Sequence, residues 1–323
     1  MNTLSANHIP GPSRIVWQVT APGGGNRPGL LALKDTLPVM SDISDAFSPP
    51  PRLILAGHPG HRHDFDLLLW SAVRRGLSVI VAPDPNATGI SAAKVEDWQF
   101  TGVDGLEVRI DSPVAKPSRA EQFENAMLQA DAATHLGLAL HVTTTITRAG
   151  VPGLERLGDL VRVLGTTEWL LDFDSPETDL SAQEAEEVLT WLSTWAREAP
   201  CRVTVYGAPQ WVRILDWAGV HWPGAVVRDG HELCFIDAFG HVYPGPRMRV
   251  LAGNLHRRAF SRIYLDAPVF EAIRDTSRLE GRCGVCGYTE LCGGSRARAL
   301  RMTGRITADD PGCLRPPDYS GIA

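Results

Sequence analysis

The first 200 residues of this 323-residue chain contain no cysteine, and two other features are also missing. No run approaches the roughly 18 apolar residues that a membrane span needs. The opening residues lack the basic-then-apolar pattern of a signal peptide. The formal net charge of −6 argues against a general nucleic-acid binder, which carries a basic patch. We therefore expect a cytoplasmic protein with neither a membrane nor a nucleic acid as its partner.

Cysteine is concentrated instead near the end of the chain. Four of the six cysteines form the pattern C-x2-C-x5-C-x20-C, namely Cys283, Cys286, Cys292 and Cys313. In a reducing compartment, clustered cysteines are more often metal ligands than disulfide partners. Four thiolates suit a structural zinc ion and an iron–sulfur cluster alike. The spacing therefore predicts a metal site and leaves its metal open.

Short apolar runs alternate with amphipathic stretches over the first two thirds of the chain. The runs are rich in β-branched residues, as buried strands are, and they cover residues 14–20, 52–56, 77–82, 105–110, 138–145, 168–173 and 202–206. Helical patterns lie between them, over residues 65–73, 121–136 and 181–195, the last with Ser181 as its N-cap. This alternation predicts an α/β fold with a parallel sheet, in the form of a barrel or a doubly wound sheet.

The pattern changes after about residue 222. Residues 234–243 indicate a β-hairpin that turns near Gly240, and a short helix over residues 268–274 leads into the cysteines. We place a domain boundary here, with a first domain over residues 1–225 and a second over residues 226–323.

Several segments closely resemble radical S-adenosylmethionine (radical SAM) enzymes of the SPASM and Twitch type, above all those of modified-haem synthesis and of peptide maturation such as mycofactocin. The segments that carry the likeness are residues 16–20, 143–148, 208–213, 234–244, 251–255, 283–299 and 310–313. The resemblance implies a partial (β/α)6 TIM-like barrel followed by a small SPASM/Twitch-like iron–sulfur domain. It also implies that Cys283, Cys286, Cys292 and Cys313 hold one auxiliary [4Fe–4S] cluster, so it favours iron–sulfur over zinc.

The motif that defines this family is absent. Its C-x3-C-x2-C loop, which binds the radical-generating cluster and S-adenosylmethionine, aligns with Gly23, Arg27 and Leu30. None of these residues ligates iron as a thiolate does, so we expect no radical-generating cluster and no S-adenosylmethionine cofactor. His58 stands where the family has a glutamate that holds the methionine ammonium group.

The inner auxiliary cluster of the family also lacks ligands in this chain. Gly245 and Ser295 stand where the family has cysteines, and the resemblance implies that Cys234 is a remnant of that site. We therefore expect an accessory protein of cofactor or peptide maturation, not a functional radical SAM enzyme on its own. Its partner would be an active radical SAM enzyme or a precursor peptide.

Two alternative functions and one question about single residues stay open. The first is an enzyme with a barrel-mouth pocket at His58, Asp111 and Asp172, which uses S-adenosylmethionine without radicals or a metal bound by His58, His61 and His63. A polar loop with solvent-facing histidines is the simpler interpretation of those three. The second is a structural zinc-bearing binding module. The question about single residues concerns the side chains of Arg296, Arg298 and Arg301. They could offset the charge of a cluster or face solvent, and the pattern favours the solvent-facing position.

Overall fold

The structure is a computed structural model that describes residues 11–21, 29–87, 89–112, 120–221 and 224–314. The chain divides into two compact units. Unit 1 comprises residues 1–107, 135–138 and 230–271, and unit 2 comprises residues 108–134, 139–229 and 272–323. The predicted boundary at residue 225 remains a prediction, and the two units do not follow it.

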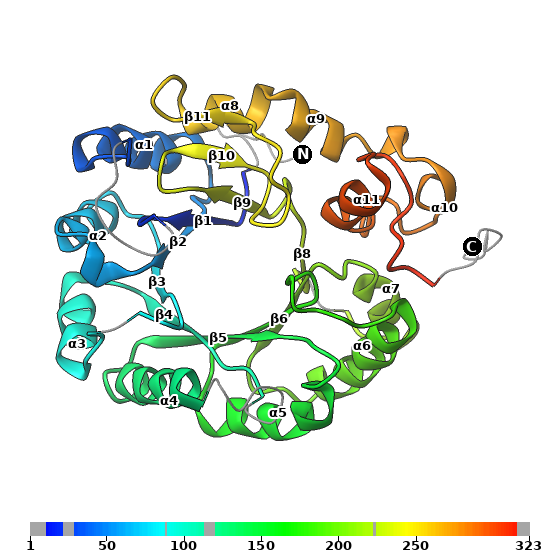
Figure 1. Cartoon of the computed structure of the whole chain (residues 1–323), viewed down its shortest axis with the longest axis horizontal. Helices are drawn as coiled ribbons and strands as arrows, with labels where there is room; N and C mark the ends of the chain where they lie inside the picture. Colours follow the sequence, from blue (N-terminus) through cyan, green and yellow to red (C-terminus); the bar gives the residue numbers. More distant parts are fainter. Residues whose placement is uncertain (1–10, 22–28, 88, 113–119, 222–223, 315–323) are drawn as a thin grey trace, which may run out of the picture. The chain divides into compact units, whose positions relative to one another are not determined.

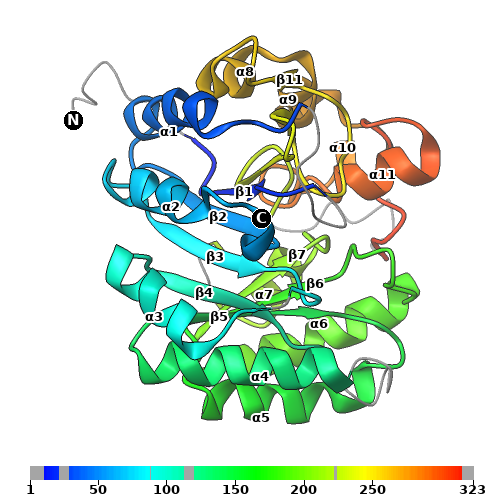
Figure 2. The same cartoon turned by 60° about the vertical axis from the view of Figure 1, so that its left-hand side comes forward.

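Unit 1 carries a sheet with the strand order β11-β10-β9-β1-β2-β3-β4. The strands are β1 (Arg14–Gln18), β2 (Arg52–Gly57), β3 (Val79–Pro83), β4 (Gly105–Arg109), β9 (Leu233–Ile236), β10 (His241–Tyr243) and β11 (Gly253–Asn254). The helices are α1 (Leu33–Ala46), α2 (Phe65–Val73), α3 (Ala92–Thr101) and α8 (Phe260–Asp266), and α9 (Pro268–Arg274) crosses into unit 2. Figures 1 and 2 show α1, α2 and α3 along one face of β1, β2 and β3.

Unit 2 carries the strand order β5-β6-β7-β8, and Ile110, just after β4, donates a backbone hydrogen bond to Thr143 of β5. The strands are β5 (Ala139–Thr145), β6 (Glu168–Asp172), β7 (Arg202–Tyr206) and β8 (Val226–Val227). The helices are α4 (Ala120–His135), α5 (Leu154–Val163), α6 (Ala182–Ala196), α7 (Trp211–Trp217), α10 (Gly281–Gly284) and α11 (Arg296–Thr303). Helices α4, α5 and α6 cover one face of β5 and β6 (Figure 1).

These elements confirm most of the pattern read from the sequence. Each of the seven predicted strands and each of the three predicted helices overlaps an observed one. Ser181 caps α6 through a full capping box with Glu184. The hairpin is confirmed by the antiparallel pairing of β9 with β10, and α9 spans the predicted short helix. Parallel strands joined by helices confirm the predicted α/β fold class, a partial barrel.

The core lies between the sheet and the helices. In β6, alternate residues point to opposite faces, and Trp169 points toward the helices, where its ring lies 4.9 Å from that of Trp195 in α6. Its neighbours Glu168 and Leu170 therefore point to the other face, which we call the inner face of the sheet. No helix of the described residues is long and apolar enough to span a membrane.

Candidate functional site

The four predicted metal ligands belong to one segment of unit 2, which we call the cysteine segment (residues 280–313). Cys283 lies in α10, and Cys286 and Cys292 lie in the turns between α10 and α11. Cys313 follows α11, and all four thiols are free of disulfides. The segment is closed at its base by a backbone hydrogen bond of 2.8 Å from Glu280 to Thr307.

Three of the sulfur atoms accept backbone N–H groups. Asp310 donates to Cys283 at 3.5 Å, Tyr288 to Cys286 at 3.5 Å, and Gly294 to Cys292 at 3.4 Å. Hydrogen bonds of this kind stabilise negative charge on sulfur and tune iron–sulfur clusters. The geometry of these donors therefore fits thiolates that serve as ligands.

Gly294 has to be glycine for this arrangement to form. Its φ of +68° lies in the left-handed region, and a Cβ there would lie 2.6 Å from the Arg296 guanidinium, 2.8 Å from Asp310 and 3.1 Å from the sulfur of Cys283. A side chain would therefore push apart the groups that surround the sulfur.

Burial keeps the thiols of Cys283 and Cys292 protonated when no metal is bound. It raises the pKa of Cys292 to about 12, and the charges of Asp310, Cys313 and Cys283 add to the rise. Burial also raises the pKa of Cys283. Because a metal binds the thiolate form, occupation of this segment would release protons.

The described residues contain no group of three or more His, Cys, Asp or Glu side chains arranged to hold a metal ion. The assignment of Cys283, Cys286, Cys292 and Cys313 as ligands therefore stays a prediction. Its structural support is the set of N–H donors around the sulfurs.

The three arginines of α11 do not behave as one solvent-facing group. Arg296 is buried, donates to the carbonyls of Ile306 and Ala308 at 2.8 and 2.7 Å, and lies 3.6 Å from the sulfur of Cys283. Arg298 pairs with Asp310 at 2.7 Å. The solvent interpretation is wrong for these two residues, because the cysteine segment folds back over them.

Arg301 is about half exposed and binds Asp174 at 2.8 Å, just beyond the end of β6. Three further contacts join the cysteine segment to the residue after β7, to α7 and to the residue after β8. Arg298 donates to Gly207 at 2.7 Å, the Tyr288 hydroxyl to Asp216 at 2.6 Å, and Arg228 to the Glu290 carbonyl at 3.0 Å. The cysteine segment is therefore fixed to the carboxyl ends of the strands of unit 2.

A second candidate region lies on the inner face of unit 2 at these strand ends. The Asp111 carboxylate accepts the backbone N–H of Thr145 at 2.7 Å, and Thr145 stands opposite Asp172 in the sheet. The structure thus places the two predicted pocket residues, Asp111 and Asp172, on either side of Thr145. The Thr145 hydroxyl is buried and has no hydrogen-bond partner.

Tyr206 completes this region and was not found from the sequence. Its hydroxyl donates to Asp229 at 3.0 Å. Burial raises the pKa of Tyr206 well above 10, and the carboxylates of Asp229, Asp172 and Asp174 add to the rise. Tyr206 therefore keeps its proton at neutral pH and acts as a donor.

One step further down the strands, a buried polar group spans three of them. The His141 imidazole lies 3.4 Å from the Glu168 carboxylate, which also accepts the Thr204 hydroxyl at 2.9 Å. The sequence did contain a signal for this group, because His141 interrupts and Glu168 borders a run that is otherwise apolar.

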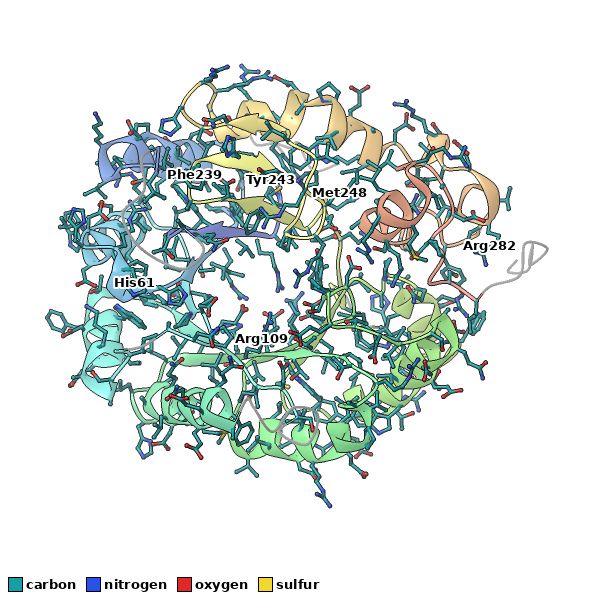
Figure 3. All side chains as sticks on the ribbon, viewed as in Figure 1. His61, Arg109, Phe239, Tyr243, Met248 and Arg282 are labelled. Atoms are coloured by element: carbon teal, nitrogen blue, oxygen red, sulfur yellow. The ribbon has the colours of Figure 1, made fainter. Side chains whose placement is uncertain are left out.

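Figure 3 shows Arg109 of β4 on the same inner side, and Arg282 at α10 in the cysteine segment.

His58, the third predicted pocket residue, belongs to unit 1. Its backbone N–H donates to the Thr20 hydroxyl at 3.0 Å, and its ring nitrogen lies 3.7 Å from the Asp84 carboxylate. The rings of His58 and His61 stack at 5.0 Å. His61 and His63 are exposed, as the polar-loop interpretation expects.

The loop that aligns with the family's cluster motif is only partly described. Gly23 and Arg27 lie outside the described residues, and Leu30 lies within them. Arg62 contacts both sides of this loop, because its guanidinium donates to the carbonyls of Val19 and Leu31 at 3.1 and 3.2 Å.

Three named proteins are similar in sequence over most of their length. An AdoMet-dependent heme synthase of Methanosarcina barkeri is 27% identical over 292 residues, which cover 83% of each chain. A pre-heme d1 synthase of Dinoroseobacter shibae is 26% identical, with coverage of 92% of this chain and 81% of the relative. A PqqA peptide cyclase of a Methylobacterium strain is 24% identical, with coverage of 82% and 73%.

Solved structures share the fold at low sequence identity. Streptococcus suis SuiB superimposes with a TM-score of 0.68 at 13% identity, over 96% of this chain and 78% of its own. Native anSMEcpe with bound AdoMet superimposes with a TM-score of 0.65 at 11% identity, over 94% of both chains. No protein-family model matches the chain. The comparisons therefore support the predicted resemblance to the radical SAM family: the chain is similar in sequence to proteins named for haem and peptide maturation, and in fold to SuiB and anSMEcpe.

Proposed function

We propose that this protein is a radical-SAM-like accessory protein of cofactor or peptide maturation that lacks the radical-generating cluster and holds one auxiliary [4Fe–4S] cluster. The observation that carries the proposal is the distribution of cysteine. The chain has no cysteine before Cys201, so the C-x3-C-x2-C motif cannot form, while the cysteine segment keeps all four of its own.

The residues around the cysteine segment support the cluster. Cys283, Cys286, Cys292 and Cys313 would be its ligands, and it would supply either electron transfer or a structural link. Backbone N–H groups aim at three of the sulfurs, and Arg296 lies beside Cys283. A cluster bound by four thiolates carries negative charge, which a buried guanidinium offsets. Zinc would use the same thiolates, and the measurement below separates the two metals.

The relatives support the kind of pathway that we propose. They are named for synthesis of haem or pre-haem d1 and for cyclisation of a peptide. A chain of this family that lacks the radical motif would act on such a pathway through a partner, which would be an active radical SAM enzyme or a precursor peptide.

The test is the iron, sulfide and zinc content of protein purified without oxygen. We expect about four irons and four sulfides per chain and a brown colour. Replacement of Cys292 by serine should remove most of the iron. Cys201→Ser and Cys234→Ser are matched controls that should keep it, because both cysteines lie outside the cysteine segment. One zinc per chain instead of iron would contradict the cluster.

A second assay tests the absence of radical chemistry. With a strong reductant and S-adenosylmethionine, the protein alone should release no 5′-deoxyadenosine. Release above the level of a heat-inactivated control would show that a radical-generating cluster is present. For the accessory role, failure to retain any active radical SAM enzyme from the same source and to bind its precursor peptide would contradict the proposal.

One observation favours an enzymatic alternative. The buried Thr145 hydroxyl lacks a partner between Asp111 and Asp172, beside the protonated Tyr206. A bound molecule with hydrogen-bonding groups would satisfy it, and solved structures of similar fold contain AdoMet. In this alternative S-adenosylmethionine binds without radical cleavage. Calorimetry with S-adenosylmethionine tests it, because binding that Asp172→Asn weakens at least tenfold would favour this function.

A further inference from the structure

A cavity of about 480 Å³ lies in unit 2, and its lining includes no residue of the inner-face rows and none of the cysteine segment. It opens between the N-terminal ends of α5 and α6. Its lining residues are Arg148, Val151, Pro152, Leu154, Glu155, Leu180, Glu184, Glu187, Val188 and Trp191. Its volume falls in the range of about 300–1,000 Å³ that is typical of ligand sites.

The cavity lies beside a close contact between α5 and α6. Helices α5 and α6 pack closely at Gly158, where an added Cβ would lie 2.7 Å from the indole nitrogen of Trp195. Closer to their N-termini, Val151 and Pro152 of η3 (Val151–Gly153) line the space beside residues of both helices. The lining therefore comes from the N-terminal parts of α5 and α6 and from the segments that lead into them.

One wall of the cavity is rigid. Trp191 stacks on Trp195 with ring centroids 6.4 Å apart, and Trp195 packs edge-on against Trp169 of β6 at 4.9 Å. Arg162 lies 4.9 Å over the ring of Trp195. A tryptophan wall that is fixed from the core outward is preorganised for an apolar group, because little side-chain freedom is lost on binding.

The rim of the cavity carries excess negative charge. Arg148 is held by both oxygens of Glu184, at 2.7 and 2.8 Å. That pair stays ionised, because the hydrogen bond to Arg148 and the N-cap contacts with Ser181 lower the pKa of Glu184 to about 2. Arg148 is the only cation among these lining residues, so Glu155 on α5 and Glu187 on α6 remain as two further exposed carboxylates, and Glu187 accepts a hydrogen bond from Gln183 at 3.2 Å.

We propose that this cavity binds a peptide segment in which an apolar side chain is flanked by lysine or arginine. The apolar side chain would enter between Leu154, Val188 and Trp191, and its basic neighbours would lie against Glu155 and Glu187. A peptide fits better than a free amine, because the carboxylates stand at the rim on two sides while the depth is apolar. This inference concerns unit 2 alone and holds whether or not the protein binds a cluster.

The probe is a fluorescently labelled peptide Lys-Leu-Lys-Leu, measured by fluorescence anisotropy with the full chain. We expect saturable binding below about 1 mM. The peptides Glu-Leu-Glu-Leu and Lys-Ser-Lys-Ser, which lack the cations and the apolar anchor respectively, should bind at least tenfold more weakly. Equal binding of all three peptides, or no saturation with Lys-Leu-Lys-Leu, would overturn the proposal.

Two charge reversals locate the site without disturbing the core. Glu155→Lys/Glu187→Lys should weaken binding at least tenfold. Glu121→Lys/Glu124→Lys, on α4 and outside the cavity, is the matched control and should leave it unchanged. Unchanged affinity in the first variant would overturn the assignment. If the cavity bound free tryptamine and did not bind the peptide, the proposed peptide ligand would be wrong and a small amine would be the ligand.

Discussion

The inner faces of the two units differ in chemistry. In unit 1, the rows paired on that face are Arg14 and Arg52, then Val16, Ile54 and Ile80, then Gln18, Ala56 and Ala82. In unit 2 the corresponding rows are His141, Glu168 and Arg202, then Thr143, Leu170 and Thr204, then Thr145, Asp172 and Tyr206. The first row carries charged residues in both units, whereas the next two rows are mainly apolar in unit 1 and mainly polar in unit 2.

The helix-facing rows do not differ in this way. In unit 1, Ile15, Trp17 and Leu53 are fully buried, and in unit 2 Trp169 and Val203 are as well. A buried polar group costs free energy unless it is hydrogen-bonded. The polar rows toward the strand ends, the cysteine segment and the cavity all belong to unit 2, so the sites that we propose lie in that unit.

The largest expected effect lies in the cysteine segment. Gly294→Ala should destabilise the protein by about 3 kcal/mol or more, because it adds left-handed strain to an overpacked contact. Gly76→Ala in unit 1 has a similar φ of +73° and no atom within 4 Å, so it should cost only about 1 kcal/mol. Urea denaturation compares the two. Equal costs would show that the packing around Gly294 is unimportant.

The buried polar group of unit 2 comes next. Glu168→Ala should lower the free energy of unfolding by about 3 kcal/mol, because His141 and Thr204 lose their shared partner in a buried site. Ile80→Val, on the inner face of unit 1, should cost about 1 kcal/mol. If Glu168→Ala were as mild as Ile80→Val, the polar face would contribute no specific stabilisation.

Two tyrosines extend the comparison to alkaline pH. Because the pKa of Tyr206 is raised in the folded protein, the folded state keeps a proton above pH 10 that the unfolded state has lost. Stability should therefore fall by up to about 1.4 kcal/mol per pH unit in that window and be unaffected below it. Tyr206→Phe should reduce the fall, and Tyr243→Phe in unit 1 should reduce it less, since Tyr243 is more exposed. Identical profiles for the two variants would contradict this assignment.

The smallest effect concerns helix caps. Ser181→Ala removes a capping box with Glu184 and should cost about 1 kcal/mol. Ser91→Ala at α3 of unit 1 removes a single bond of 3.3 Å and should cost about 0.5 kcal/mol. Thermal unfolding of both variants checks the order, and a larger loss at Ser91 would reverse it.

The fold was largely predictable from the sequence. Strands such as residues 202–206 show buried β-branched runs, and local signals such as Ser181 and Gly240 mark where elements begin and turn. The family resemblance then selected a partial barrel from the two architectures that the alternation allowed.

The site was less predictable, because its parts come from distant residues. Asp111 and Asp172 could be proposed as strand-end residues, but Tyr206 and Asp229 meet only in the folded sheet. Arg296 and Arg298 resemble surface residues on a helix with three arginines. Their burial depends on the return of residues 306–310 over α11, which no local pattern indicates. The cavity between α5 and α6 is lined by residues from Arg148 to Trp191, and no local pattern of the sequence indicates it.

Mössbauer spectroscopy of protein reconstituted with enriched iron tests the central claim most directly. The account predicts one [4Fe–4S] component with about four irons per chain, which disappears in Cys292→Ser and persists in Cys234→Ser. Two cluster components in the wild-type protein, or a component that survives Cys292→Ser unchanged, would contradict it.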